Sequence, residues 1–273
     1  MHLYIVINNF NEKGMTKIRI LFLATLLPLI SCSTDDNNPT GENPQAADCK
    51  ISAITYGFYS GDIVYSAAYS GENITELTSN VDKVVFTYDA QNHLTKKEFY
   101  DIGNSQVKFK TEFTTNYSGQ ITEQRNWEFY SGSLQYTGKK SFSHNGNKLT
   151  QIIDYDVDDI SIQNKLVYQW TGDNPTKLSV YNENDLLECA NTIAYDLTKE
   201  NKFNLTFPYF VFQDIYDEDF QLYMFLGKNI ITSTTNSCSG ETDNYNTNLL
   251  SNELIDNVKR NGDLLWKFLY NCE

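Results

Sequence analysis

The feature that most constrains this chain is a hairpin pattern that repeats from Ile51 almost to the C-terminus. Each unit of roughly 25 to 30 residues has a segment rich in Tyr, Phe, Val and Thr, a short turn of Asn, Gly or Asp, and a second such segment. Val84, Phe86 and Tyr88 share one face of a strand, and the alternation resumes at Leu94 after a turn. Successive hairpins of this kind predict an antiparallel meander.

Charged and apolar side chains alternate within the strand segments, as Lys108, Phe109 and Lys110 illustrate. Antiparallel sheets commonly keep one face in water, and the alternation predicts such a face here. The expected fold is therefore all-β, an antiparallel meander of repeated hairpins that forms one strongly curved sheet or an open barrel. No linker-like stretch divides residues 51–273, so we expect these residues to form a single domain.

The repeat is interrupted at residues 195–230. A polar stretch there precedes a nearly continuous apolar run at 205–212, and a second aromatic run at 220–226 follows an acidic turn. We interpret this segment as a long insertion whose aromatic residues plug or cap one end of the sheet, with a short helix at residues 219–226. Patterning alone does not separate helix from strand in so short a run.

The N-terminal region predicts export and lipid attachment. Residues 18–30 form an apolar run after Lys17, and its length fits a signal peptide better than a membrane helix, which needs about 20 apolar residues. The sequence Leu-Ile-Ser-Cys at residues 29–32 resembles the bacterial lipobox, whose cysteine is lipidated and becomes the new N-terminus. We therefore predict that residues 1–31 are a signal peptide and that Cys32 carries the lipid, palmitate among its acyl chains.

Residues 1–14 fit no signal sequence, so we hypothesise that translation begins at Met15. Residues 32–50 are polar and rich in Asn and Pro, which predicts a flexible tether behind the lipidated cysteine. Its acidic pair, Asp35 and Asp36, resembles the signal that sends Bacteroidota lipoproteins to the outer face of the outer membrane. The alternative is that the two carboxylates only solvate the tether.

The charge balance excludes two classes of partner. The chain has 21 Lys and Arg against 35 Asp and Glu, for a formal charge of −14. Nucleic acid and an anionic membrane surface would be repelled by this excess. We expect no nucleic-acid partner, no cofactor, and a monomer whose membrane attachment is the lipid on Cys32.

Four cysteines remain after Cys32, and an even number in an exported chain favours two disulfides. Cys49 opens the first predicted strand and Cys272 closes the last, so a sheet that curls until its ends meet would join them. We favour the pairs Cys49–Cys272 and Cys189–Cys238, with free buried thiols as the alternative. A zinc site is not expected, because the sequence has no CxxC motif and few histidines.

The segment FTYDAQNHLTK at residues 86–96 resembles the YD repeats of Rhs-like proteins. With the lipobox, the Tyr195-Asp196 pair and the run LGKNIIT at residues 226–232, it makes the chain similar to a Bacteroidota family of lipoproteins built on a domain of unknown function. The resemblance implies a curved antiparallel sheet anchored at the outer membrane, at the cell surface or on the periplasmic face. It assigns no activity and no site residues.

Three acidic residues at alternate positions, Asp154, Asp156 and Asp158, resemble the opening of a calcium-binding loop. The pattern departs from that loop at its sixth and twelfth positions, where Asp159 and Lys165 replace Gly and Glu. On a strand the three carboxylates would share a face and repel one another, which a cation would relieve. The alternative is a solvated turn or strand edge.

Aromatic residues exceed what one buried face requires, with 19 Tyr and 16 Phe. Exposed Trp and Tyr rings stack on sugars or anchor protein interfaces, which makes Trp127, Tyr130, Trp170 and Tyr209 candidate ligand-stacking residues. The alternative is that such rings fill the interior of a curved sheet and pair across strands.

The sequence has no G-x-S-x-G nucleophile motif. We therefore predict an outer-membrane-anchored lipoprotein that is a non-enzymatic binding or structural module for a glycan, peptide or lipid. The alternative is a polysaccharide hydrolase with two carboxylates about 5–10 Å apart in a cleft. A third possibility is a closed apolar cavity that holds one lipid.

Overall fold

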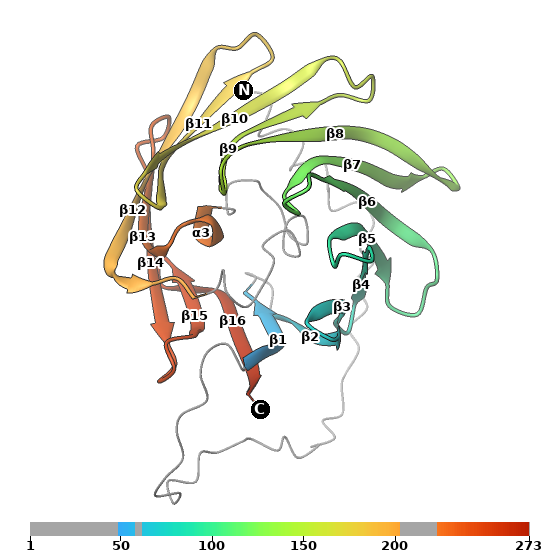
Figure 1. Ribbon diagram of the computed structural model, residues 1–273, viewed down its shortest axis with the longest axis horizontal. Coiled ribbons are helices and arrows are strands. Elements are labelled where there is room, and N and C mark those ends of the chain that lie inside the picture. Colours follow the sequence, from blue (N-terminus) through green and yellow to red (C-terminus); the bar gives the residue numbers. More distant parts are fainter. Residues whose placement is uncertain (1–48, 58–61, 203–222, 273) are drawn as a thin grey trace, which may run out of the picture. The chain divides into compact units, whose positions relative to one another are not determined.

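The computed structural model describes residues 49–57, 62–202 and 223–272, which belong to one compact unit, residues 42–273. They form sixteen antiparallel strands that follow one another in chain order and close into a barrel (Figure 1). The predicted meander is therefore confirmed, and the sheet curves until its ends pair. The strands are β1 (Cys49–Tyr56), β2 (Ile63–Ser70), β3 (Asn73–Thr78), β4 (Asp82–Tyr88), β5 (Leu94–Asp101), β6 (Val107–Thr115), β7 (Ile121–Tyr130), β8 (Ser133–Asn145), β9 (Lys148–Tyr155), β10 (Ile162–Thr171), β11 (Asn174–Asn182), β12 (Leu187–Glu200), β13 (Asn229–Asn236), β14 (Thr242–Leu249), β15 (Ile255–Arg260) and β16 (Asp263–Cys272).

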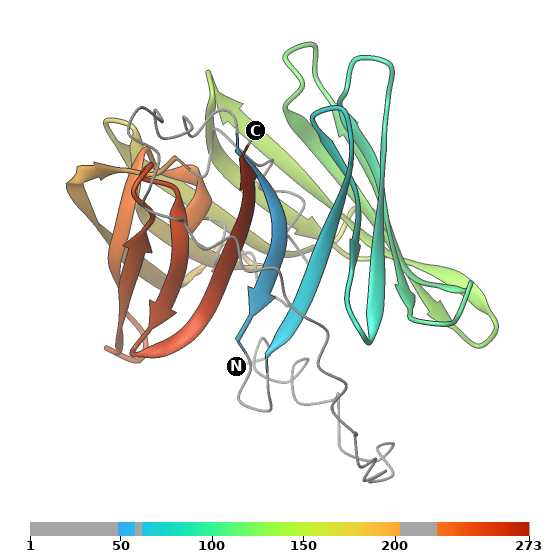
Figure 2. The ribbon, with the colours of Figure 1, turned by 90° about the horizontal axis from the view of Figure 1, so that it is seen from below.

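The barrel closes where β1 meets β16. The two strands pair from Cys49 opposite Cys272 to Tyr56 opposite Trp266, and Figure 2 shows them side by side. A disulfide joins Cys49 to Cys272, as predicted, and so links the first strand to the last. The β structure begins at Cys49, slightly before the predicted boundary at residue 51. Closure leaves the sheet formed by the described strands without a free edge.

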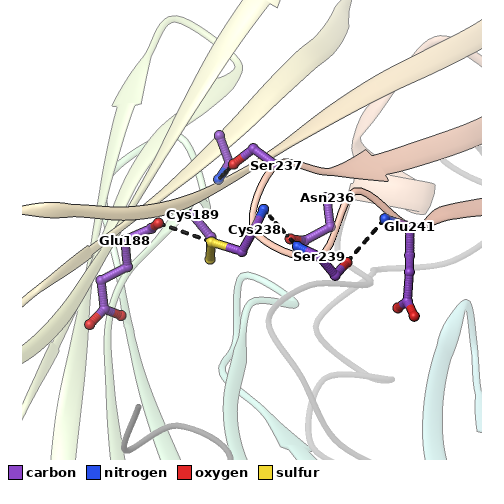
Figure 3. The surroundings of a disulfide bond; sticks show 8 residues. Glu188, Cys189, Asn236, Ser237, Cys238, Ser239 and Glu241 are labelled. Atoms are coloured by element: carbon purple, nitrogen blue, oxygen red, sulfur yellow. Dashed lines mark hydrogen bonds between the residues drawn. A yellow bond between two sulfur atoms is a disulfide. The ribbon is translucent and has the colours of Figure 1, made fainter.

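The second predicted disulfide, Cys189–Cys238, is also confirmed (Figure 3). It attaches the turn between β13 and β14 to the first residues of β12. In this turn Asn236 Oδ1 accepts a hydrogen bond from the main-chain N–H of Cys238 at 2.8 Å, and the N–H of Ala190 donates to Ser237 Oγ at 2.8 Å. The crosslink therefore lies in a turn that hydrogen bonds already order.

The two faces of the wall differ in polarity. One face of each strand supplies the hydrophobic core, in which Leu77, Val84, Ile152 and Leu178 have no exposed surface. In a closed barrel the face that packs upon itself is the inner one, and the alternate residues of each strand point outward. The outward residues are largely Lys, Glu, Thr, Ser and Asn, so the more polar face of the sheet is the outside of the barrel.

Three hairpin turns, residues 89–93, 116–120 and 182–186, share one local structure. Each begins with Asp or Asn, whose side-chain oxygen accepts hydrogen bonds from the main-chain N–H groups two and four residues further on. The fourth residue has a positive φ in every case: Asn92 at 65°, Gly119 at 76° and Asp185 at 60°. Asp, Asn and Gly tolerate this conformation, which explains why the sequence pattern places them between strands.

Neighbouring turns at the Cys49 end of the barrel are bonded to one another. In three places a side chain at the start of a strand donates to the carbonyl of a turn glycine in the next hairpin. The pairs are Lys50 Nζ to Gly71 at 3.1 Å, Gln120 Nε2 to Gly146 at 2.8 Å and Lys148 Nζ to Gly172 at 2.6 Å. These bonds tie successive hairpins together around this end.

The predicted insertion at residues 195–230 is described in part, because residues 203–222 lie outside the described ranges. Strand β12 extends to Glu200, the helix α3 (Tyr223–Leu226) lies within the helix predicted at residues 219–226, and β13 begins at Asn229. Phe225 belongs to the hydrophobic core of the barrel. Asn174 Nδ2 donates to Asn229 Oδ1 at 2.9 Å, which links β11 to the first residue of β13.

Candidate functional site

The candidate site is a cavity of about 330 Å³, within the roughly 300–1,000 Å³ range of small-molecule sites. We call it the inner cavity, because most of its lining residues belong to the inner face of β4 to β8, the strands drawn from teal to green in Figure 1. It is bordered by Val84, Lys97, Phe99, Phe109, Lys110, Thr111, Asn126, Trp127, Glu128 and Thr137.

Strand register sorts the inner-face residues of this cavity into two neighbouring rows. The first row crosses the strands as Lys97, Thr111 and Asn126, which are direct cross-strand partners. The second row crosses them as Val84, Phe99, Phe109 and Glu128. Because residues two apart on a strand share a face, a polar row lies beside a row that is mainly apolar.

Hydrogen bonds hold the polar row in place. Asn126 Oδ1 accepts from Thr111 Oγ1 at 3.2 Å and from Gln124 Nε2 at 2.9 Å. Lys97 and Thr111 expose only 6% and 5% of their surface, so they are polar groups inside the barrel wall rather than solvated ones. Buried polar groups with fixed partners present a defined pattern of donors and acceptors.

The apolar row is open on the cavity side. Phe99 and Phe109 meet edge to face with ring centroids 5.8 Å apart. Phe109 exposes 39% of its surface, whereas Val84 in the same row has none exposed. The ring of Phe109 is thus available for contact from the cavity.

The outer face behind the cavity carries charges in cross-strand rows. Lys110 Nζ lies 3.7 Å from the ring centroid of its cross-strand partner Trp127 and 2.9 Å from Glu112 Oε1. In the neighbouring row Glu112 is opposite Arg125, which contacts Glu123 at 2.8 Å. The wall of β5 to β7 therefore has a mixed inner face and a densely charged outer face.

The four predicted stacking residues are not brought together as one site. Trp127 borders the cavity, but its ring lies beneath Lys110. Tyr130 is 71% exposed at the end of β7, and Trp170 is part-buried and donates from Nε1 to the carbonyl of Leu149 at 2.8 Å. Tyr209 lies outside the described residues, as does Cys32.

The three candidate calcium ligands also separate. Asp154 lies in β9 and accepts from Asn164 Nδ2 at 3.4 Å, whereas Asp156 and Asp158 belong to the following turn. Asp158 accepts from the main-chain N–H of Ser161 at 2.7 Å, and the Ser161 hydroxyl, with the main-chain N–H groups of this turn, holds the pKa of the Asp158 carboxyl below its usual value. Within the described ranges, no three His, Cys, Asp or Glu side chains are grouped closely enough to hold a metal ion.

Sequence reasoning missed Lys97, Phe99, Phe109, Thr111, Asn126 and Glu128 as site residues. One signal was available, since Lys97 and Phe99 are two apart and so share a face, which places a lysine among apolar neighbours. The rest of the cavity depends on the register of β4 and β6 against β5, and on that of β7 and β8 beyond them. Among the described residues that border the cavity, Glu128 is the one carboxylate, whereas the predicted hydrolase needs a pair.

Comparison with solved structures places the fold among porin-like barrels. A porin-like protein from Bacteroides uniformis matches 81% of this chain and 96% of its own, with a TM-score of 0.55 and 16% identity. A porin-like protein from Bacteroides vulgatus matches 82% of this chain and 99% of its own, with a TM-score of 0.52 and 13% identity. At these identities the likeness concerns the fold.

No protein-family model matches the chain, and no curated protein matches it at the level of sequence. The resemblance to YD-repeat lipoproteins therefore stays a prediction from the motifs alone. Within the described part of the chain, no helix is long and apolar enough to cross a membrane.

Proposed function

We propose that this protein is a lipid-anchored protein of the outer membrane whose barrel stands in water and acts as a non-enzymatic binding module. The lipobox at residues 29–32 supports the anchor, and the polar tether that follows it supports a barrel held away from the lipid. The observation that most directly supports this proposal is the distribution of polar and apolar side chains between the two faces of the barrel wall. Most side chains that face outward are charged or polar, and the large apolar side chains of the core face inward.

A barrel that spans a membrane needs the opposite arrangement, with an apolar outer band about 25 Å tall. Here the outer rows of β5 to β8 carry charges in the middle of the strands, where a bilayer core would lie. One row runs through Lys96, Glu112, Arg125 and Lys139, each opposite the next. An outward Arg or Lys at the bilayer midplane costs about 2–4 kcal/mol, and this single row contains three of them.

The porin-like proteins share this barrel architecture, and their name associates the fold with a membrane channel. The same fold serves a different role when the polarity of its wall is reversed, because function depends on the side chains rather than on the fold. In water the charged outer rows are solvated at little cost, and the apolar inner residues supply the core. With the outer face in solvent and the apolar inner residues packed as core, the inner cavity is the place where a ligand would bind.

The test separates a lipid-anchored barrel from a membrane-spanning one. Residues 1–32 are replaced by a leader that ordinary signal peptidase removes, so that the mature chain begins at Ser33 and carries no lipid. We expect the unchanged protein in the outer-membrane fraction and the lipid-free protein in the soluble periplasmic fraction. Washing both membrane preparations with alkaline carbonate provides the control for loose adsorption.

A lipid-free chain that remains in the carbonate-washed outer membrane would contradict the proposal. A barrel that spans the bilayer predicts that result, because its attachment does not depend on Cys32. Loss of the unchanged protein from the membrane fraction would contradict the lipid anchor itself.

A further inference from the structure

We infer that the inner cavity is a carbohydrate site that takes a mono- or disaccharide unit. The inference rests on the proposed function, since it assigns a ligand class to the same water-exposed barrel. The volume of about 330 Å³ admits a small polar molecule but not an extended polymer. The choice of ligand follows from the lining.

A sugar ring has apolar C–H faces and a rim of hydroxyl groups. The inner cavity offers the complementary pair of surfaces on adjacent rows. The exposed ring of Phe109, buttressed edge to face by Phe99, can pack against a C–H face. Lys97, Thr111 and Asn126 supply donors and acceptors along the neighbouring row, at the spacing of one strand to the next.

Glu128 adds a further hydrogen-bonding group, at the end of the row that is otherwise apolar. It lies directly opposite Phe109 and is exposed on the cavity side of the wall. A carboxylate accepts hydrogen bonds from two vicinal hydroxyl groups, an arrangement that sugars supply and hydrocarbons do not. One edge of a bound ring would therefore face Glu128 while its C–H face rests on Phe109.

An acyl chain fits this lining poorly. Its methylene groups would cover the exposed carboxylate of Glu128 and lie against Lys97, Thr111 and Asn126, and they would offer none of these groups a hydrogen bond. Removing a polar group from water without a compensating hydrogen bond is costly.

A peptide also fits poorly in its commonest binding mode. Extended peptides usually add a strand to an exposed sheet edge, where main-chain groups are available. The described strands close into a barrel, with β1 paired to both β2 and β16, so that the sheet offers no such edge. The side chains of the inner cavity are then left as the recognition surface, and they favour a sugar.

The test uses the full lipidated chain in detergent micelles, with empty micelles as the blank. Saturation-transfer NMR is recorded with cellobiose, maltose and N,N′-diacetylchitobiose, with sodium octanoate as the acyl-chain probe and tetra-alanine as the peptide probe. Dissociation constants for any probe that responds are then measured by calorimetry. The variants are Phe109→Ala in the cavity and Phe129→Ala as the matched control, because β7 register places Phe129 on the outer face.

We expect at least one disaccharide to bind, Phe109→Ala to weaken that binding about tenfold or more, and Phe129→Ala to leave it unchanged. Glu128→Gln should weaken it to a smaller extent without altering the unfolding midpoint, which guards against a folding artefact. The inference is overturned if no disaccharide binds, if Phe109→Ala binds as well as the unchanged protein, or if only octanoate or tetra-alanine responds. Failure of the proposed function gives a different result, a lipid-free chain that stays in the membrane.

Discussion

Two regions of the same wall use their inner faces differently. In the closing segment, strands β15, β16, β1 and β2, large apolar side chains fill the interior. Tyr56 packs on Trp266 with ring centroids 4.5 Å apart, Trp266 stacks on Phe268 at 6.4 Å, and Ile54 and Tyr65 are almost wholly buried. In the pocket segment, strands β4 to β8, a polar row and an open cavity replace that packing. The strand pattern is the same, so the inner residues decide whether the wall is packed core or lines a cavity.

The outer faces of the two regions also differ, in how densely they are charged. The outer face of the closing segment mixes uncharged residues such as Ala53, Thr55 and Leu269 with lysines such as Lys50 and Lys267. The pocket segment carries the charged rows that contain Lys110 and Arg125. A mixed inner face provides less hydrophobic stabilisation, and cross-strand ion pairs and cation–π contacts on the outside offset part of that loss.

The largest expected effect comes from truncating a phenylalanine in each region. Phe268→Ala should lower the free energy of unfolding by about 3–5 kcal/mol, because a side chain with 1% of its surface exposed is removed from a packed core. Phe109→Ala should lower it by less than about 1 kcal/mol, since the ring is 39% exposed. Urea unfolding followed by tryptophan fluorescence measures both.

The neighbouring residue Leu269 provides the control for Phe268. It is 51% exposed on the outer face of the same strand, so Leu269→Ala should change the unfolding free energy by less than about 1 kcal/mol. Equal destabilisation by Phe268→Ala and Phe109→Ala would mean that the two regions are packed alike, which would contradict the difference described above.

The next effect concerns the crosslink of the closing segment. Replacing Cys49 and Cys272 by Ser should lower the free energy of unfolding by about 2–5 kcal/mol, since the disulfide constrains the unfolded chain. The sequence separation of 223 residues exceeds the 49 residues between Cys189 and Cys238, so the loop-entropy model predicts about 1 kcal/mol more for the first pair. The urea midpoints of the two double variants, each compared with the oxidised parent that keeps both disulfides, measure this difference. A larger loss for the Cys189–Cys238 pair would show that loop length does not govern the two crosslinks.

Much of this architecture could be predicted from the sequence, for reasons that are local. Asp89 and Asn116 open turns through bonds to their own neighbours, and alternation along one strand separates Lys108 from Phe109. The disulfide pairing followed from the ends of the meander. These inferences need only short-range chemistry or the order of the strands.

The inner cavity could not be predicted in the same way. Phe99 faces Phe109, and Phe109 faces Glu128, only because of the register across three strands. Register is shifted by bulges, such as the one between Asn126 and Trp127, and a shift of one residue reverses the face of every side chain beyond it. Closure at sixteen strands likewise depends on the whole sheet.

A smaller effect is expected on the outer face of the pocket segment. Lys110→Ala removes the contact with the Trp127 ring at 3.7 Å and the ion pair with Glu112 at 2.9 Å. Both partners are partly solvated, so the unfolding free energy should fall by about 0.5–1 kcal/mol, and less at high salt. Lys267→Ala on the exposed outer face of the closing segment is the control, and we expect no measurable change. A loss at Lys267 equal to that at Lys110 would remove the proposed role of the outer contacts.

The smallest effect distinguishes the turns of the two regions by their response to acid. The turn at residues 89–93 is capped by a carboxylate, and the main-chain N–H of His93, with that of Gln91, holds the pKa of Asp89 below its usual value. A lowered pKa in the folded state stabilises the protein above the usual Asp pKa of about 3.9, and this contribution is lost as the pH falls through the lowered value. The corresponding turn that leads from β14 into the closing segment begins with Leu250, which has no side-chain oxygen to titrate.

Asp89→Asn tests this point with a residue that the protein already uses, since Asn116 caps the next turn of the same kind. The amide oxygen accepts the same two N–H groups and does not titrate, so the unfolding free energy at neutral pH should not change. Below about pH 4 the variant should lose less stability than the unchanged protein, because the parent must protonate its cap. Urea midpoints measured from pH 7 down to pH 3 give both curves. Parallel curves would assign the acid sensitivity to other carboxylates, and a loss at neutral pH would mean that the negative charge, rather than the pair of hydrogen bonds, orders this turn.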